Sequence, residues 1–219
     1  MKKIFILFLL ISMSAIVYSQ TGIIREIAGD VELKSAGSSV FVRAQSGSHV
    51  EENTIVSTGF RSTAVIAVGS SLITVQPLTR LTLSEIQSSS GVENLNVNLQ
   101  SGRIRVDVKP PAGTRVSTIV QSPSATASVR GTILEMDIYN LDVVEGTVNW
   151  SGSDNVPVSV SKGSSTISID GSAGNPISLS SIGLLPSLPV GAGLSGETLP
   201  VSNTVPPPVN GNLDIKINW

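Results

Sequence analysis

Few side chains in this sequence could carry out catalysis or bind a metal ion. The chain has a single histidine, His49, and no cysteine, so a cluster of imidazoles, a thiolate zinc site and a cysteine nucleophile are all excluded. His49 stands near Glu51 and Glu52, and one histidine with two carboxylates could hold a metal ion. A surface turn is the better explanation of these residues, and we predict no metal site.

Three acids further along the chain could also gather in one place. Asp137, Asp142 and Glu145 are of the kind used in glycoside cleavage or in calcium binding. Asp137 belongs to the stretch Glu135–Ile138, in which polar and apolar residues alternate, and this pattern is typical of a half-exposed β-strand. We therefore expect these acids on the solvent-facing side of strands.

Neither nucleophilic nor nucleotide chemistry has a supporting motif. A serine hydrolase would need His49 as its base, but the sequence has no Gly-x-Ser-x-Gly turn to present the serine. Gly191, Gly193 and Gly196 have the spacing of a dinucleotide-binding loop, yet prolines flank them, with no strand pattern before and no helix pattern after. We predict no catalytic residue, no metal and no cofactor.

The charge of the chain argues against nucleic acid as a partner. Its 219 residues include 14 Lys+Arg and 16 Asp+Glu, for a formal net charge of −2. Proteins that bind nucleic acid usually have an excess of positive charge, which this chain lacks. Aromatic residues make up 4 % of the chain, so valine, isoleucine and leucine must provide most of the buried surface.

The N-terminal segment has the pattern of a secretory signal. Lys2 and Lys3 precede an apolar run over Ile4–Val17, and small residues follow it. We predict cleavage between Ser19 and Gln20, and therefore export to the periplasm, the cell surface or the medium with no stable membrane span. Without cysteine there is no lipid anchor. An uncleaved membrane anchor is the alternative, although the run is shorter than the roughly 20 apolar residues of a comfortable span.

Residues 20–182 have the two-residue periodicity of β-strands. In the clearest run, Ile104, Val106 and Val108 alternate with Arg103, Arg105 and Asp107. We expect hairpins through the links 100–102 and 161–165, with the second pairing Val156, Val158 and Val160 with Ile167 and Ile169. The sequence predicts an all-β domain, a compact antiparallel β-sandwich or β-roll, with a short β-solenoid as the alternative.

The composition changes near the C-terminus. Residues 183–212 are rich in Pro, Gly and Ser, which is typical of an extended linker. Residues 213–219 alternate again, with Leu213, Ile215, Ile217 and Trp219 on one side. A single strand needs a neighbour. This one could return to the domain's edge, pair with another protein or begin a further module.

Several short motifs follow one another between Thr21 and Trp150. They are Gly22–Leu33, Asn53–Gly59, Val68–Gly69–Ser70, Leu99–Val106, Ser128–Met136 and Val144–Trp150. In this order they resemble the FecR domain, a periplasmic signalling domain of bacterial envelope proteins. The most specific part is Val129–Arg130–Gly131–Thr132 before an apolar strand. Val68–Gly69–Ser70 takes the place of an Asp-Gly-Ser turn in the family.

The motif glycines have structural explanations. Gly59, Gly69, Gly102 and Gly146 each lie between two alternating runs, where a tight turn or a positive φ is needed. Gly131 falls in an extended stretch, which suggests a bulge or close backbone packing.

Arg130, beside Gly131, offers a fork of hydrogen-bond donors. These donors could tie the local backbone internally or bind a ligand.

The resemblance implies a function only in part. FecR-type regulators carry a cytoplasmic segment that contacts a sigma factor, whereas only Met1–Lys3 precede the apolar run here. We therefore expect an exported, non-enzymatic FecR-like module that senses or binds an envelope protein or a glycan. The alternatives are a regulator anchored by Ile4–Val17 that partners an outer-membrane receptor, and a structural surface subunit.

Overall fold

The computed structural model describes residues 21–89 and 91–178, which form nineteen strands and, within these ranges, no helix. The chain divides after Gly183 into two units, and the description concerns the first. The predicted signal segment with its cleavage site between Ser19 and Gln20, the linker and the terminal strand 213–219 lie outside the described residues. Nowhere in the described ranges does a helix reach the length and apolarity needed to cross a membrane.

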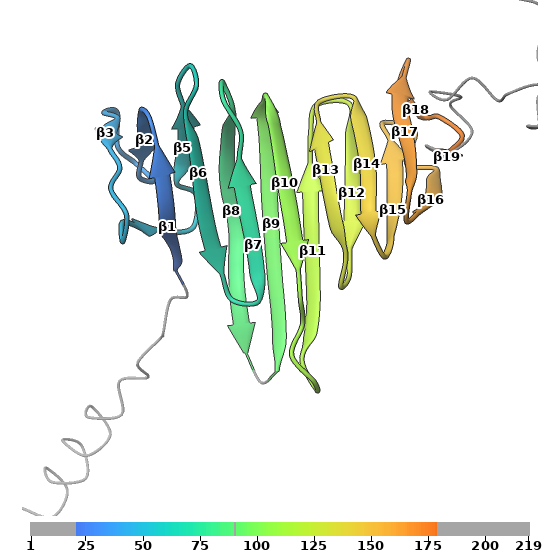
Figure 1. Ribbon diagram of the computed structural model, residues 1–219, viewed down its shortest axis with the longest axis horizontal. Helices are drawn as coiled ribbons and strands as arrows, with labels where there is room; N and C mark the ends of the chain where they lie inside the picture. The colour runs from blue at the N-terminus through green and yellow to red at the C-terminus, as the bar shows by residue number, and fades with distance from the viewer. Residues whose placement is uncertain (1–20, 90, 179–219) are drawn as a thin grey trace, which may run out of the picture. The chain divides into compact units, whose positions relative to one another are not determined.

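The strands form two sheets (Figure 1). Sheet A contains, in spatial order, β18 (Ser172–Ala173), β17 (Ser164–Ile169), β14 (Asn140–Glu145), β13 (Ile133–Asp137), β10 (Arg103–Val108), β7 (Ser71–Val75), β6 (Thr63–Val68), β1 (Gly22–Ala28) and β4 (His49–Val50), and β19 (Ile177–Ser178) also pairs with β17. Sheet B contains β16 (Pro157–Ser161), β15 (Thr147–Gly152), β12 (Ala125–Val129), β11 (Arg115–Gln121), β9 (Val92–Ser101), β8 (Arg80–Ser89), β5 (Ile55–Thr58), β2 (Val31–Lys34) and β3 (Val42–Arg43). The predicted all-β sandwich is confirmed.

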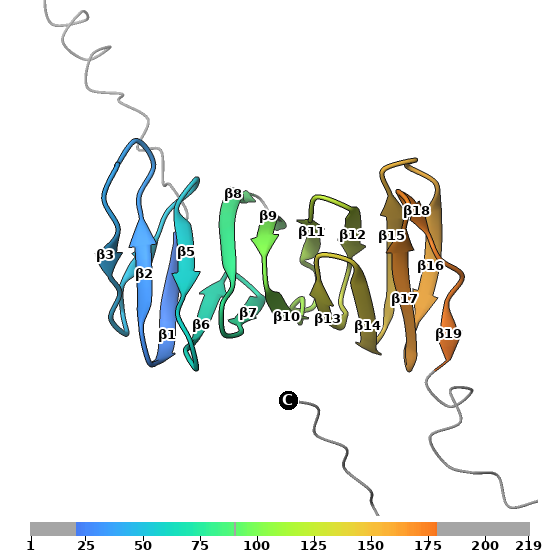
Figure 2. The ribbon, with the colours of Figure 1, turned by 90° about the horizontal axis from the view of Figure 1, so that it is seen from above.

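The chain moves steadily along the sandwich while it crosses between the sheets. The colours in Figure 2 therefore run from blue at the β3 end of the sandwich, through green near β8 and β9, to orange at the end with β16–β19. Neighbouring strands are antiparallel except β9 and β11, which are parallel because the intervening β10 lies in the other sheet. In a β-solenoid, the alternative that the sequence left open, the chain would also advance steadily along one axis.

The core lies between the two sheets and consists mainly of β-branched and leucine side chains. The largest fully buried residues are Trp150, Ile24, Ile66, Ile73, Leu81, Leu83, Leu99, Ile104, Leu134, Met136, Leu141 and Val31. On β10, Ile104, Val106 and Val108 point inward and the polar residues between them face outward. Because polar and apolar residues alternate along each strand, every second side chain points into the common core.

The two hairpins that we expected through the links 100–102 and 161–165 are absent. β9 and β16 lie in sheet B, whereas β10 and β17 lie in sheet A. β17 pairs with β14 instead of β16, and its Ile167 and Ile169 are exposed. The expected pairing was wrong because alternation identifies a strand but not its sheet.

Three connections between strands share one arrangement, which we call a hydroxyl clasp. In each, a buried hydroxyl residue immediately before a strand donates to the carbonyl two residues earlier. The donors are Ser62, Thr79 and Thr132, and the acceptors are the carbonyls of Phe60, Pro77 and Arg130, at 3.1, 3.3 and 3.3 Å. The residues between them, Arg61, Leu78 and Gly131, have φ of 53°, 57° and 61°. All three connections cross from one sheet to the other.

Each clasp also binds a second crossover. The Ser62 hydroxyl accepts from the backbone N–H that follows Gly29 at 2.8 Å, and Thr79 does the same for the N–H that follows Gly102 at 3.0 Å. The Thr132 hydroxyl donates to the carbonyl that follows Gly146 at 3.1 Å. The clasps therefore tie neighbouring crossovers together in pairs and fix where the chain changes sheet.

Candidate interaction site

The glycines of the FecR-like motifs lie at opposite ends of the strands. The β5–β6 and β9–β10 connections, which contain Gly59 and Gly102, are at the upper end in Figure 1, and the β6–β7 and β14–β15 connections, which contain Gly69 and Gly146, are at the lower end. Gly69, Gly102 and Gly146 have φ of 53°, 86° and 84°, whereas Gly59 is not among the positive-φ residues of the described chain. These residues shape separate turns and do not form one site.

Val129, Arg130, Gly131 and Thr132 form the corner between β12 and β13. Val129 is a core residue, and Thr132 provides a clasp. Gly131 turns the corner with a left-handed φ and is not inside a strand, so the bulge that we expected there is absent. The Arg130 side chain is exposed and makes no hydrogen bond or ion pair with any described residue, so the structure does not show the internal tie.

Glu93 is a structural partner of Gly69 that sequence reasoning missed. Its carboxylate accepts hydrogen bonds from the N–H and the hydroxyl of Ser70, at 2.9 and 2.6 Å. A Cβ on Gly69 would lie 2.6 Å from a Glu93 oxygen. The positive φ favours glycine in the turn before β7, and a side chain there would also displace the Glu93 carboxylate from Ser70.

The residues considered for metal binding do not assemble into a metal site. His49 lies on the edge strand β4, where its Nδ1 is 3.3 Å from the Thr21 hydroxyl. Among the described residues no group of three potential ligands is close enough to hold an ion. Asp137 of β13 and Asp142 of β14, in contrast, both approach Arg103 of β10 from the same side of that strand, on the outer face of sheet A.

Strand β17 has the reverse of the usual polarity. Opposite the buried Leu141 of β14 lies Thr166, and Thr166 and Ser168 point into the sandwich. Their hydroxyls donate to the carbonyls of Gly174 and Ser124, at 2.6 and 2.9 Å. Outside, Ile167 and Ile169 are 40 % and 56 % exposed, and Ile177 of the neighbouring β19 is 49 % exposed. We call Ile167, Ile169 and Ile177 the isoleucine patch.

A cavity of about 400 Å³ adjoins the isoleucine patch. Its lining residues are Arg103, Asn140, Asp142, Ser165, Thr166, Ile167, Asn175 and Ile177. The register places Ile167 beside Asn140, and Ser165 between Asp142 and Ile177. The site therefore combines apolar side chains from β17 and β19 with polar side chains from β10 and β14.

The charged groups of this cavity are partly neutralised by one another. Arg103 lies opposite Asp137 in the register and binds it at 2.7 Å, and it reaches Asp142 at 3.8 Å. Arg105 pairs in the same way with Glu135 at 2.7 Å. Two arginines thus face three carboxylates, and Asp142 has the most distant partner.

The two aspartates titrate in opposite directions. Burial raises the pKa of Asp142, and Glu135 and Asp137 add to this effect while Arg103 opposes it. Burial would also raise the pKa of Asp137, but hydrogen bonds from Tyr139, Asn140 and Arg103 outweigh it and lower this pKa. The ionised form of Asp137 is therefore stabilised by the fold, and that of Asp142 is disfavoured.

We expect Asp137→Asn to lower the free energy of unfolding by about 1 kcal/mol at neutral pH. Because the folded-state pKa of Asp137 is lowered, its contribution is complete above the unfolded pKa of about 4 and is lost as the pH falls through the folded pKa. Urea unfolding at several pH values should show the deficit shrinking in acid. The matched variant Asp142→Asn should have no deficit at neutral pH; equal deficits for both variants would contradict the assignment.

Comparison with known proteins finds a family model that matches part of this domain. Residues 53–149 match the family model "FecR protein". The resemblance to the FecR family is confirmed. The matched part of this FecR-like domain runs from before β5 into β15 and includes the clasps of Ser62, Thr79 and Thr132. No curated protein matches the chain.

Solved structures with a similar chain path include two crystal structures of a proposed anti-sigma factor from Parabacteroides distasonis ATCC 8503, at 1.65 and 2.50 Å resolution. Each aligns at 13 % identity with a TM-score of 0.44. The alignment covers 56 % of this chain and 57 % of theirs, so this chain spans little more than half of their length.

Proposed function

We propose that this chain is an exported, non-enzymatic FecR-like module that binds a protein partner in the bacterial cell envelope through the isoleucine patch. The FecR match supports a role in signalling or regulation, since domains of this family are signalling domains of the envelope. The N-terminal pattern of Lys2, Lys3 and an apolar run supports export.

The observation that carries the proposal is the reversed polarity of β17. A strand that buries Thr166 and Ser168 while it exposes two isoleucines runs against the rule that apolar side chains face the core. Departures of this kind concentrate at functional sites, and exposed apolar groups rimmed by polar ones are typical of protein interfaces. The adjoining cavity gives a partner side chain a place to enter.

The charges around the cavity indicate that the partner's side chain is positively charged. Asp142 is only distantly paired with Arg103 and lies near Glu135 and Asp137. A lysine or arginine beside an apolar residue of the partner would complete the pairing while the apolar residue packs on Ile167 and Ile177. A glycan is the other partner class that the sequence leaves open, but none of the described residues that line this cavity is an aromatic on which a sugar could stack.

The test is affinity capture from cross-linked envelopes with the tagged full chain. We expect the double variant Ile167→Ser/Ile177→Ser to reduce recovery of the specific partner at least about tenfold, because truncation of central apolar contacts removes most binding energy. Both residues are about half exposed, so the melting temperature should hardly change.

The matched control is Ile23→Ser/Leu72→Ser. These residues have similar exposure and lie on other strands of the same sheet. Recovery should be retained with this control, and a comparable loss with both double variants would refute the assignment of the patch.

A further inference from the structure

Two turns at the upper end of the strands each present a large apolar side chain to solvent. Phe60, between β5 and β6, is 71 % exposed, and Leu78, between β7 and β8, is 62 % exposed. The turns are adjacent, since the Leu78 N–H donates to the Gly59 carbonyl at 3.2 Å. Figure 1 shows both at the same end of the two sheets.

These turns hold their apolar residues outward in a costly backbone conformation. Arg61 and Leu78 have φ of 53° and 57°, a region that costs a side chain other than glycine or asparagine roughly 1–2 kcal/mol. The Thr58 hydroxyl fixes the second turn, because it donates to the Gln76 carbonyl at 2.6 Å and accepts from the Thr79 N–H at 3.0 Å. An asparagine would suit the position of Leu78 better, so packing within the domain does not account for leucine there.

Two cations adjoin the apolar turns, Arg61 next to Phe60 and Arg80 two residues after Leu78, and Lys34 lies further along sheet B, opposite Ile55 of β5. The Arg61 guanidinium lies 5.3 Å from the Phe60 ring centre. Lys34 and Arg80 lie 5.4 and 5.6 Å from the ring centre of Phe41. None of the three forms an ion pair with the described residues.

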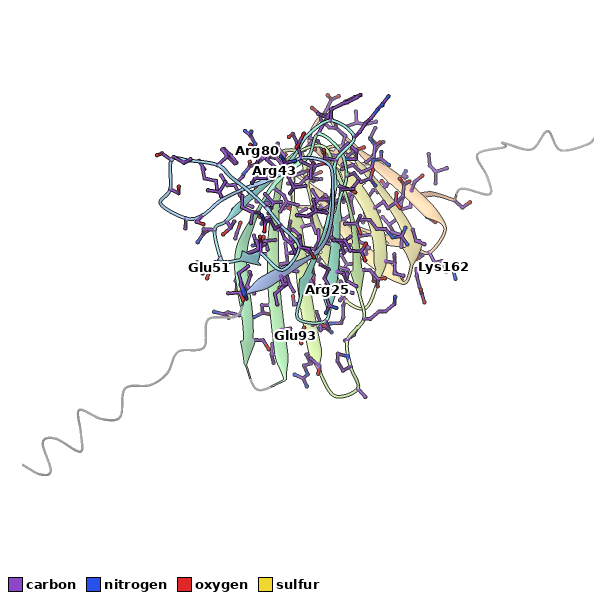
Figure 3. All side chains as sticks on the ribbon, turned by 60° about the vertical axis from the view of Figure 1, so that its left-hand side comes forward. Arg25, Arg43, Glu51, Arg80, Glu93 and Lys162 are labelled. Atoms are coloured by element: carbon purple, nitrogen blue, oxygen red, sulfur yellow. The ribbon has the colours of Figure 1, made fainter. Side chains whose placement is uncertain are left out.

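Asp30 and Glu32, which lie just before and in the neighbouring β2, form no ion pair with these three cations. Asp30 is already paired with Arg43 at 2.5 Å, and Glu32 is exposed and opposite Arg43 in the register. Figure 3 shows Arg43 and Arg80 at the same end of the strands, away from Glu93. The part of the upper end around the β5–β6 and β7–β8 turns therefore has two projecting apolar side chains, with cations beside them that form no ion pair with the described residues.

We propose that this surface docks on an anionic phospholipid bilayer. Phe60 and Leu78 enter the interface between headgroups and acyl chains, while Arg61, Lys34 and Arg80 lie at the level of the phosphates. Two projecting apolar side chains flanked by unpaired cations match a surface that is apolar inside and anionic outside. This goes beyond the proposed function and uses none of the residues of the isoleucine patch.

The proposal is tested by sedimentation of the full chain with vesicles of phosphatidylglycerol and phosphatidylethanolamine, with phosphatidylcholine vesicles for comparison. The wild type should bind the anionic vesicles, and binding should weaken with salt. Phe60→Ser/Leu78→Asn should lose at least about tenfold in affinity. Lys34→Gln/Arg61→Gln/Arg80→Gln should lose about a hundredfold, at about fivefold for each cation.

Leu78→Asn alone separates binding from folding. Because asparagine tolerates the left-handed conformation, the melting temperature should rise by about 2–4 °C while vesicle binding falls. Val92→Ser/Val144→Ser, which removes exposed apolar side chains towards the lower ends of β9 and β14, should bind as the wild type does. Wild-type binding that is equal on both vesicle types, or binding to soluble poly-glutamate but not to vesicles, overturns the proposal; the second result would assign the surface to an acidic protein.

Discussion

Replacing Trp150 with alanine should lower the free energy of unfolding by about 3–5 kcal/mol, the usual range for loss of a large buried aromatic. Trp150 is the largest of the fully buried side chains. It lies on β15 between Ala127 of β12 and Val158 of β16. The small Ala127 leaves room for the indole, and removal of the ring leaves a cavity that the rigid sheets cannot close.

The control is Trp150→Phe. The indole Nε1 is buried and has no hydrogen-bond partner in the described part of the chain, so phenylalanine retains much of the packing and removes an unpaired donor. Its cost should be about 1–2 kcal/mol. Urea unfolding followed by far-UV circular dichroism measures both variants. Equal losses for alanine and phenylalanine, or a loss below 1 kcal/mol for alanine, would contradict this account of the core.

Gly102→Ala should destabilise the domain by about 3–5 kcal/mol. Gly102 has φ of 86°, and a Cβ there would lie 2.5 Å from the Thr79 Cα. The variant therefore strains the backbone and breaks the clasp in which the Thr79 hydroxyl binds the Arg103 backbone. The same unfolding experiment measures the effect.

Gly113→Ala is the matched control. Gly113 has φ of 84°, but a Cβ there would meet nothing within 4 Å. It should cost only the left-handed strain of about 1–2 kcal/mol. If the two alanine variants cost the same, the clasp contributes nothing and the close contact is unimportant.

The strands and the core were predictable because two-residue alternation depends on local sequence alone. β10 shows this well, since each apolar residue from Ile104 to Val108 is buried. The same pattern could not show that Gly102 leads into the other sheet. That outcome depends on the Thr79 hydroxyl, which is distant in sequence and binds both backbone groups of Arg103. The clasps follow no regular sequence spacing, so no repeat was visible.

The candidate site was harder to predict for a related reason. Alternation groups Ile167 with Ile169 on one face of β17, but it does not say which face is buried. Leu141 decides this, because it lies opposite Thr166 and points into the core. The sequence drew attention to Asp137 and Asp142, which both approach Arg103, and Asp142 also lines the cavity. It gave no sign of Glu93 or of the exposed isoleucines.

Site-specific photo-cross-linking in intact cells tests the central claim most directly. A photoreactive residue at position 167 or 177 should give a discrete adduct with an envelope protein, because the isoleucine patch is the proposed interface. The same residue at position 72, on the same sheet face, should give none. Adducts of equal yield at all three positions, or none at 167 and 177, would show that the outward isoleucines of β17 and β19 do not bind a partner.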